Sequence, residues 1–168
     1  MQNTLSPESQ KSLTNLMIIW FTMVGALFVY LFVCYLVLIQ EKFKAPYTLD
    51  ILQTNLFMGI EANTAIYIAA ALIFIVGDFN FKTSYRKLIF DVARQTFENK
   101  DEEFKYFRTK YTTMMFIHLA IFDAIAILGV IVFFLTLDFT TLVNLVIISL
   151  FGFVVVMPSK SKFQYRTK

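Results

Sequence analysis

The chain has 168 residues, of which 58% are hydrophobic and only 16% are charged, and its mean hydropathy is +0.65. Soluble globular domains carry about 25% charged residues, so this composition excludes a soluble domain and indicates an integral membrane protein. The formal net charge is +3. The distribution of the basic residues along the chain is more informative than their total.

Four apolar stretches are long enough to cross a bilayer as helices, since a hydrocarbon core of about 30 Å requires about 20 helical residues. The predicted spans are residues 16–39, 56–77, 114–137 and 139–157, the last closed by Pro158. Only Asp138 separates the third and fourth spans, so these two helices are expected to form a tight antiparallel pair. We therefore predict an all-α polytopic membrane protein, a single membrane domain over residues 1–168 that folds as an antiparallel bundle of four transmembrane helices.

The connection between the second and third spans, residues 78–110, contains eight basic and six acidic residues and is too polar to cross the membrane. Its apolar residues recur at helical spacing, which predicts a helical hairpin with one apolar face, made of Leu88, Ile89, Val92 and Phe97. Two interpretations of the hairpin remain open. Either this face docks a partner protein or anionic lipid headgroups, or the two spans simply extend into the aqueous phase.

Lys and Arg are distributed unequally between the two sides of the predicted bundle. With four crossings, thirteen basic residues fall on the side of both termini and of residues 78–110, and only Lys42 and Lys44 fall on the other side. Cytoplasmic loops of membrane proteins are enriched in Lys and Arg. Both termini and the hairpin at 78–110 are therefore predicted to be cytoplasmic.

Five polar side chains interrupt the spans and are the candidate functional residues: Glu61, Tyr67, His118, Asp123 and Asn144. Helical rise places Asp123 about 13 Å and Tyr67 about 15 Å from the cytoplasmic ends of their spans, Asn144 about 20 Å and Glu61 about 24 Å. Similar depth favours Tyr67 or Asn144 as the hydrogen-bond partner of Asp123. The set is interpreted either as a proton or cation path or as interhelical hydrogen bonds that hold the bundle together.

The sequence gives no sign of metal, cofactor or catalytic chemistry. A single histidine excludes a bis-His haem within this chain, and no Cys/His cluster has metal-ligand spacing. No nucleophile–base pair or phosphate-binding loop is visible. We expect no metal, no cofactor and no enzymatic activity, and we expect His118 to be a packed or interface-facing residue.

Residues 119–129, LAIFDAIAILG, place the carboxylate of Asp123 before a small residue in an apolar third span, and Met157-Pro158-Ser159-Lys160 ends the fourth. These features resemble a widespread group of small bacterial four-span inner-membrane proteins of unknown function. The third span is also similar to the carboxylate-bearing helix of rotary ATPase proteolipid subunits, from which the long charged connection departs. The first resemblance implies a bacterial inner membrane, and the second directs attention to Asp123.

Two functions follow from these features. A non-enzymatic accessory or scaffold subunit of a larger membrane complex fits the small size and the lack of a catalytic constellation. The alternative is a proton or cation conduit subunit that uses Glu61 and Asp123. The expected partners are other membrane-protein subunits or a second copy of the chain within the lipid bilayer, and nucleic acid is not expected.

Overall fold

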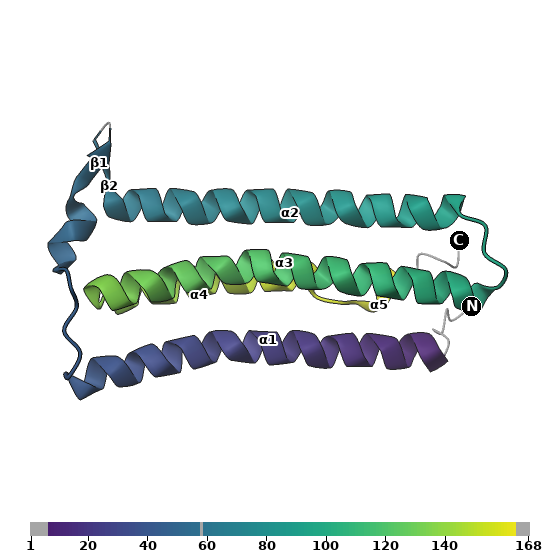
Figure 1. Ribbon diagram of the computed structural model, residues 1–168, viewed down its shortest axis with the longest axis horizontal. Coiled ribbons are helices and arrows are strands. Elements are labelled where there is room, and N and C mark those ends of the chain that lie inside the picture. Colours follow the sequence, from purple (N-terminus) through teal and green to yellow (C-terminus); the bar gives the residue numbers. More distant parts are fainter. Residues whose placement is uncertain (1–6, 58, 164–168) are drawn as a thin grey trace.

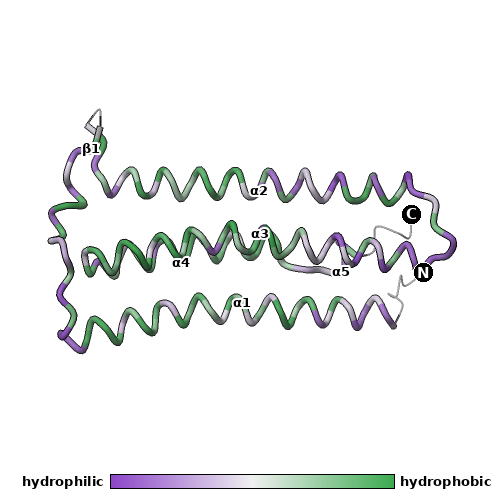
Figure 2. The backbone as a smooth tube through the Cα atoms, viewed as in Figure 1, coloured by the Kyte–Doolittle hydropathy of each residue, from purple (hydrophilic) through white to green (hydrophobic). Residues whose placement is uncertain are grey.

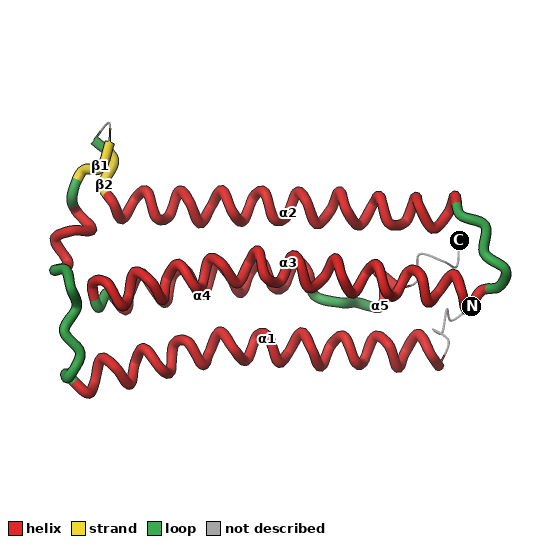
Figure 3. Tube along the Cα trace, in the orientation of Figure 1, coloured by secondary structure: helices red, strands yellow, loops and turns green. Residues whose placement is uncertain are grey.

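The computed structural model describes residues 7–57 and 59–163 of the chain. Within these residues lie four long helices and one short one: α1 (Pro7–Gln40), α2 (Ala62–Arg94), α3 (Lys100–Thr136), α4 (Phe139–Val156) and α5 (Lys160–Phe163). The segment between α1 and α2 holds the 3₁₀ helix η1 (Leu49–Gln53) and a small antiparallel hairpin of β1 (Asn55–Phe57) and β2 (Ile60–Glu61). Figure 3 shows how completely helices dominate the rest of the fold.

Four helices of the described chain are long and apolar enough to cross a membrane, which agrees with the prediction of an all-helical membrane protein. The helices α2 and α3 have 33 and 37 residues. At helical rise these lengths correspond to about 50 Å and about 55 Å, well beyond the hydrocarbon core. Their extra length lies at the end where residues 95–99 join them, and Figure 2 shows hydrophilic residues gathered at that end.

The loop between α2 and α3 ends in a well-formed helix cap. The Asn99 side chain accepts a 2.8 Å hydrogen bond from the Glu102 backbone N–H, and the Glu102 carboxylate accepts a 3.1 Å bond from the Glu98 backbone N–H. These bonds satisfy backbone donors that a helix start leaves open. Acidic residues in the first turn, including Asp101 and Glu103, also favour the positive end of the helix dipole.

Helices α3 and α4 form the centre of the molecule, with α2 on one side and α1 on the other (Figure 1). Trp20, in the first half of α1, contacts Phe153 near the end of α4, whereas Tyr35, near the end of α1, contacts Phe139 at the start of α4. The order of contacts is therefore reversed between these two helices. In their most apolar 18-residue stretches, 44% of residues are buried in α3 and α4, but only 17% in α2 and 11% in α1.

One aromatic ring and two glycines set the closest approach of the helices. Phe122 of α3 is fully buried, and its ring faces Gly77 of α2 and Gly152 of α4. A Cβ atom at position 77 would lie 2.9 Å from the ring atom Cε1, and one at position 152 would collide with the ring. Small residues permit such close helix packing in lipid, where no hydrophobic force drives helices together.

The chain after α4 folds back onto the extended halves of α2 and α3. The Phe163 ring packs 5.6 Å from the Phe107 ring and 5.3 Å from the Tyr111 ring of α3. Tyr85 of α2 donates a 2.9 Å hydrogen bond to the backbone carbonyl of Lys162. The basic residues Arg166 and Lys168, counted in the predicted orientation, lie outside the described residues.

The observed helix ends correct the predicted spans. The stretch 56–77 does not begin as a helix: β1 and β2 pair around Gly59, whose φ of 78° suits a residue without a side chain, and α2 starts only at Ala62. Met58, also in that predicted span, lies outside the described residues. The third span ends at Thr136 because Leu137 adopts a left-handed conformation, and the fourth ends at Val156, two residues before Pro158.

The Phe122 contact predicts that Gly152→Ala lowers the free energy of unfolding by about 1–3 kcal/mol, because the added methyl group forces the ring out of its seat. Unfolding in mixed detergent micelles, followed by circular dichroism, measures the change. Gly25→Ala is the matched control, because a Cβ atom added at Gly25 of α1 would have no neighbouring atom within 4 Å. That variant should gain stability by up to about 1 kcal/mol, as Ala favours a helix over Gly.

Candidate functional site

Asp123 lies half-buried on α3 and is bonded to α1. Its Oδ2 atom accepts a 3.3 Å hydrogen bond from the hydroxyl of Tyr30. The prediction that Tyr67 or Asn144 is its partner is wrong, because α2 and α4 pack on the Phe122 side of α3 whereas Asp123 points toward α1. Tyr30 was missed by the sequence analysis. The signal for it was its hydroxyl, one of few hydrogen-bond donors in the charge-free stretch 16–39.

Asn144 and Tyr67, two of the predicted candidates, form a second polar pair. The Asn144 Nδ2 amide donates a 2.9 Å hydrogen bond to the Tyr67 hydroxyl and so joins α4 to α2. The Asn144 side chain is nevertheless exposed at the side of the bundle. One turn away from Tyr67, the Oδ1 atom of Asn63 is buried without a hydrogen-bond partner in the described part of the chain.

Glu61 lies apart from both pairs. It belongs to β2, pairs with Asn55 across the small hairpin and is exposed. The interpretation of Glu61 as a carboxyl group within a helical span is therefore wrong. The physical reason is local: the chain turns at Gly59, and Glu61 is the extended residue that precedes the first helical residue, Ala62.

His118 is almost completely buried, with 4% of its surface exposed. Its Nδ1 atom donates a 2.7 Å hydrogen bond to the backbone carbonyl of Met114, and its ring meets the Phe81 ring edge-on at 5.3 Å. A carbonyl only accepts, so Nδ1 carries a proton and Nε2 is left for another partner. No residue in the described chain bonds to Nε2, and His118 lines a groove between α2 and α3.

The predicted docking face is turned into the protein. Leu88 and Val92 are buried in one cluster with Phe107 of α3, and Ile89 and Phe97 are partly buried against it. Leu88 and Val92 therefore do not form an exposed docking face, because most of their surface fills the contact between the extended halves of α2 and α3. Helices α2 and α3 continue beyond their apolar stretches and pack against each other there.

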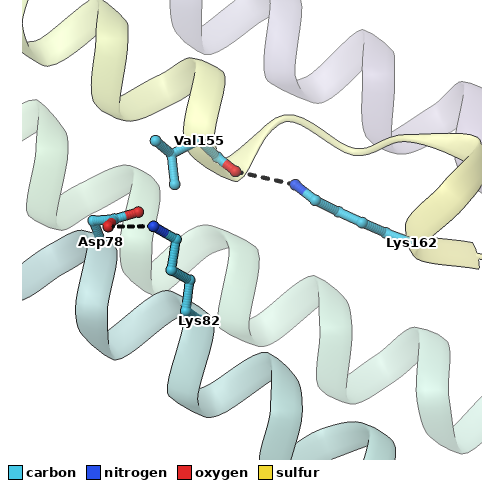
Figure 4. A network of polar contacts seen from close by, with 4 residues as sticks. All are labelled: Asp78, Lys82, Val155 and Lys162. Atoms are coloured by element: carbon cyan, nitrogen blue, oxygen red, sulfur yellow. Dashed lines mark hydrogen bonds and ion pairs between the residues drawn. The ribbon is translucent and has the colours of Figure 1, made fainter.

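Three further hydrogen bonds join the C-terminal end of α4 to α1 and to Lys162 in the segment that follows α4. The Trp20 indole N–H donates a 2.8 Å hydrogen bond to the Phe153 carbonyl, which ties α1 to α4. The Lys162 ammonium donates to the carbonyls of Val155, at 3.0 Å, and Met157, at 2.7 Å. Figure 4 shows the bond to Val155 beside the ion pair of Asp78 and Lys82. A helix leaves its last carbonyls unpaired, so Lys162 acts as the cap of α4.

The polar groups described above join helices to one another. Over residues 7–57 and 59–163 no group of three His, Cys, Asp or Glu side chains is placed to hold a metal ion. The pairs Tyr30–Asp123 and Tyr67–Asn144 attach the two outer helices to the central ones. No hydrogen bond found in the described structure connects one pair with the other. The two pairs are therefore separate interhelical hydrogen bonds.

The Tyr30–Asp123 bond predicts energetic coupling between these two residues. In a double-mutant cycle of Tyr30→Phe and Asp123→Ala, the coupling should be about 0.6 kcal/mol and not above about 2 kcal/mol, the range of interhelical hydrogen bonds in membranes. Asp123→Asn should keep most of the stability, because an amide oxygen also accepts from the Tyr30 hydroxyl. Unfolding in mixed micelles provides the free energies.

Tyr35→Phe is the control for this cycle, since Tyr35 is 49% exposed on the same helix and forms only a ring contact with Phe139. It should show no coupling to Asp123→Ala. Equal coupling for Tyr30 and Tyr35 would contradict a specific bond at Tyr30.

Comparison with known proteins gives this chain no relatives. No protein-family model matches it, and neither does any curated protein sequence or any solved structure. The interpretation of its function therefore depends on the residues and contacts described above.

Proposed function

We propose that this protein is a non-enzymatic accessory or scaffold subunit of a larger membrane complex, with its four helices arranged as an antiparallel bundle across a bacterial inner membrane. The main support is an imbalance in packing. In the apolar stretches of the central helices α3 and α4, 44% of the residues are buried, against only 11% in α1 and 17% in α2. Many large apolar side chains of α1 and α2 are exposed. Such faces contact lipid in an isolated subunit and other helices in a complex.

The observation that carries the proposal is the exposed amide of Asn144. One of its N–H groups is bonded to Tyr67, which leaves another N–H and the amide oxygen facing outward from the middle of α4. An unpaired polar group costs several kcal/mol in hydrocarbon, where water is absent. A hydrogen bond from a polar side chain at this depth would remove this cost. Such a side chain could belong to a helix of another subunit or of a second copy.

The same proposal includes the orientation of the protein in the membrane. Both termini and the joined ends of α2 and α3 would lie in the cytoplasm, on the strength of the thirteen basic residues on that side against two on the other. In Figure 1 the start of α1, the short helix α5 and the loop between α2 and α3 lie at the same end of the molecule. A single crossing direction therefore accounts for the position of all three.

The conduit alternative has less support. A conduit requires polar groups that connect the two membrane faces, and its two proposed carboxyls are separated. Asp123 is engaged by Tyr30, and Glu61 lies beyond the start of α2 in the β hairpin. Phe122 and Ile125, close to Asp123 along α3, are apolar and fully buried.

The orientation predicts that a thiol at position 48 reacts with a membrane-impermeant maleimide in intact cells, while one at position 96 reacts only after permeabilisation. Thr48→Cys and Thr96→Cys serve for the test, because both threonines are exposed and lie at opposite ends of the bundle. Cys34, 1% exposed, is replaced by Ala in both variants. The reverse labelling pattern would overturn the orientation.

The subunit role predicts that Asn144→Leu releases partners from the complex. The affinity-tagged chain is extracted in a mild detergent, and co-isolated proteins are quantified by mass spectrometry, with native gels reporting a second copy. Loss of one interhelical polar contact worth about 1–2 kcal/mol should lower recovery of the adjacent partner about 5- to 30-fold.

Phe32→Leu is the control, because Phe32 is 61% exposed on α1 and is apolar before and after the change. It should leave partner recovery unchanged. If wild type carries no stoichiometric partner and forms no oligomer, or if Asn144→Leu keeps full recovery, the proposal is overturned.

A further inference from the structure

A groove of about 390 Å³ runs between the extended halves of α2 and α3, where their polar residues give way to the apolar spans. Its floor is formed by the buried side chains of Leu88 and Met114, and the exposed side chain of Ile117 continues its apolar lining. Its rim is polar and carries charged, hydroxyl and imidazole groups, contributed by Ser84, Lys87, Asp91, Tyr106, Lys110, Thr113 and His118. An apolar floor beneath a charged rim matches the division of a phospholipid into acyl chains and headgroup.

The polar groups are ordered by depth along the two helices. Helical rise places Lys87 about one turn from both Asp91 and Ser84, and Lys110 about one turn from both Tyr106 and Thr113. Since Phe81 contacts His118 and Tyr85 contacts Tyr111, the two lysines lie at similar levels on facing helices. From the aqueous end inward, the groove thus presents the Asp91 carboxylate and the Tyr106 phenol, then two ammonium groups, two aliphatic hydroxyls and an imidazole. The Lys110 ammonium lies 5.8 Å from the centre of the Tyr106 ring.

His118 provides an independent sign of a ligand. The ring is 4% exposed, its Nδ1 atom is used by the Met114 carbonyl, and its Nε2 atom lacks a partner throughout the described chain. Nε2 is not among the fully enclosed side-chain atoms that lack a partner, so it can be reached from the groove and can bond a ligand or water there. The lining of the groove includes this ring, so a ligand seated there would reach it.

We propose that the groove between α2 and α3 binds a phospholipid with a single negative charge and a hydroxylated headgroup, such as phosphatidylglycerol. Lys87 and Lys110 contact the phosphate from two helices, and Ser84, Thr113 and His118 surround it on the membrane side. Asp91 accepts hydrogen bonds from the headgroup hydroxyls and disfavours a headgroup carboxylate. The acyl chains continue past Ile117, which is 54% exposed. This inference is independent of the subunit role.

The test uses the full-length protein in detergent micelles that contain equal amounts of dioleoyl phosphatidylglycerol and dioleoyl phosphatidylcholine, with bound lipid counted by native mass spectrometry. The wild-type protein should retain more phosphatidylglycerol than phosphatidylcholine. Each lysine near an anionic lipid contributes about 5-fold in affinity, so Lys87→Gln with Lys110→Gln should lower retention about 25-fold.

The matched control is Arg86→Gln with Lys105→Gln, which removes the same charge from exposed positions of α2 and α3 outside the groove. It should change retention by less than about 2-fold, because distant surface charges are screened. An equal loss of phosphatidylglycerol retention in both double variants would overturn the proposal. It would show that positive charge attracts the lipid without a specific binding site.

Thr113→Trp distinguishes binding of the lipid within the groove from attraction of the lipid by charge alone. Thr113 is exposed and bonds only to the Thr109 carbonyl of its own helix, so the variant keeps the fold and every charge while it fills the groove. It should abolish phosphatidylglycerol retention. Retention at the wild-type level, with helix content unchanged by circular dichroism, would overturn the proposal.

Discussion

The packing of the Phe122 ring against Gly77 and Gly152 is the constraint on which the rest of the bundle depends. Helices in lipid gain little from apolar contact as such, and close van der Waals approach at small residues takes its place. One ring here locks α3 to both α2 and α4. It also constrains the rotation of α3 about its own axis, because it directs one side of α3 at both α2 and α4.

The polar contacts follow from that rotation. Consecutive helical residues are about 100° apart, so a Phe122 ring directed at α2 and α4 turns Asp123 toward α1 and Tyr30. His118, one turn earlier, shares the face of Phe122 and therefore meets Phe81 and the groove between α2 and α3. Each outer helix then gains its own bond to the centre: α1 through Tyr30 and Trp20, and α2 through Tyr67.

The end of the molecule near both termini has a different character. Aromatic rings of α3 and the Phe163 ring of α5 pack together there, while Lys162 caps the last carbonyls of α4. The same end holds most of the basic residues. If that side faces the cytoplasm, the charges that set the orientation and the lysines that line the groove belong to one surface, which anionic headgroups would cover.

The amino-acid sequence by itself determined the class of protein, the number of long helices and several of their ends. These properties depend on the length of apolar runs and on local signals such as Pro158, which acts within one or two turns. Helical rise also predicted a depth for each polar residue, which does not apply to Glu61 because it lies in β2 and not in a helix. It could not give the direction in which a residue points, because rise fixes position along an axis and leaves rotation and neighbours open.

Only the tertiary structure decided which groups meet. It paired Asp123 with Tyr30 and not with the residues of similar depth on α2 and α4, because those helices occupy the Phe122 face. It turned Leu88 and Val92 inward, since α2 and α3 use each other to cover the apolar faces of their extended halves. A sequence shows that such a face exists, but what covers it is settled by contacts between residues far apart in the chain.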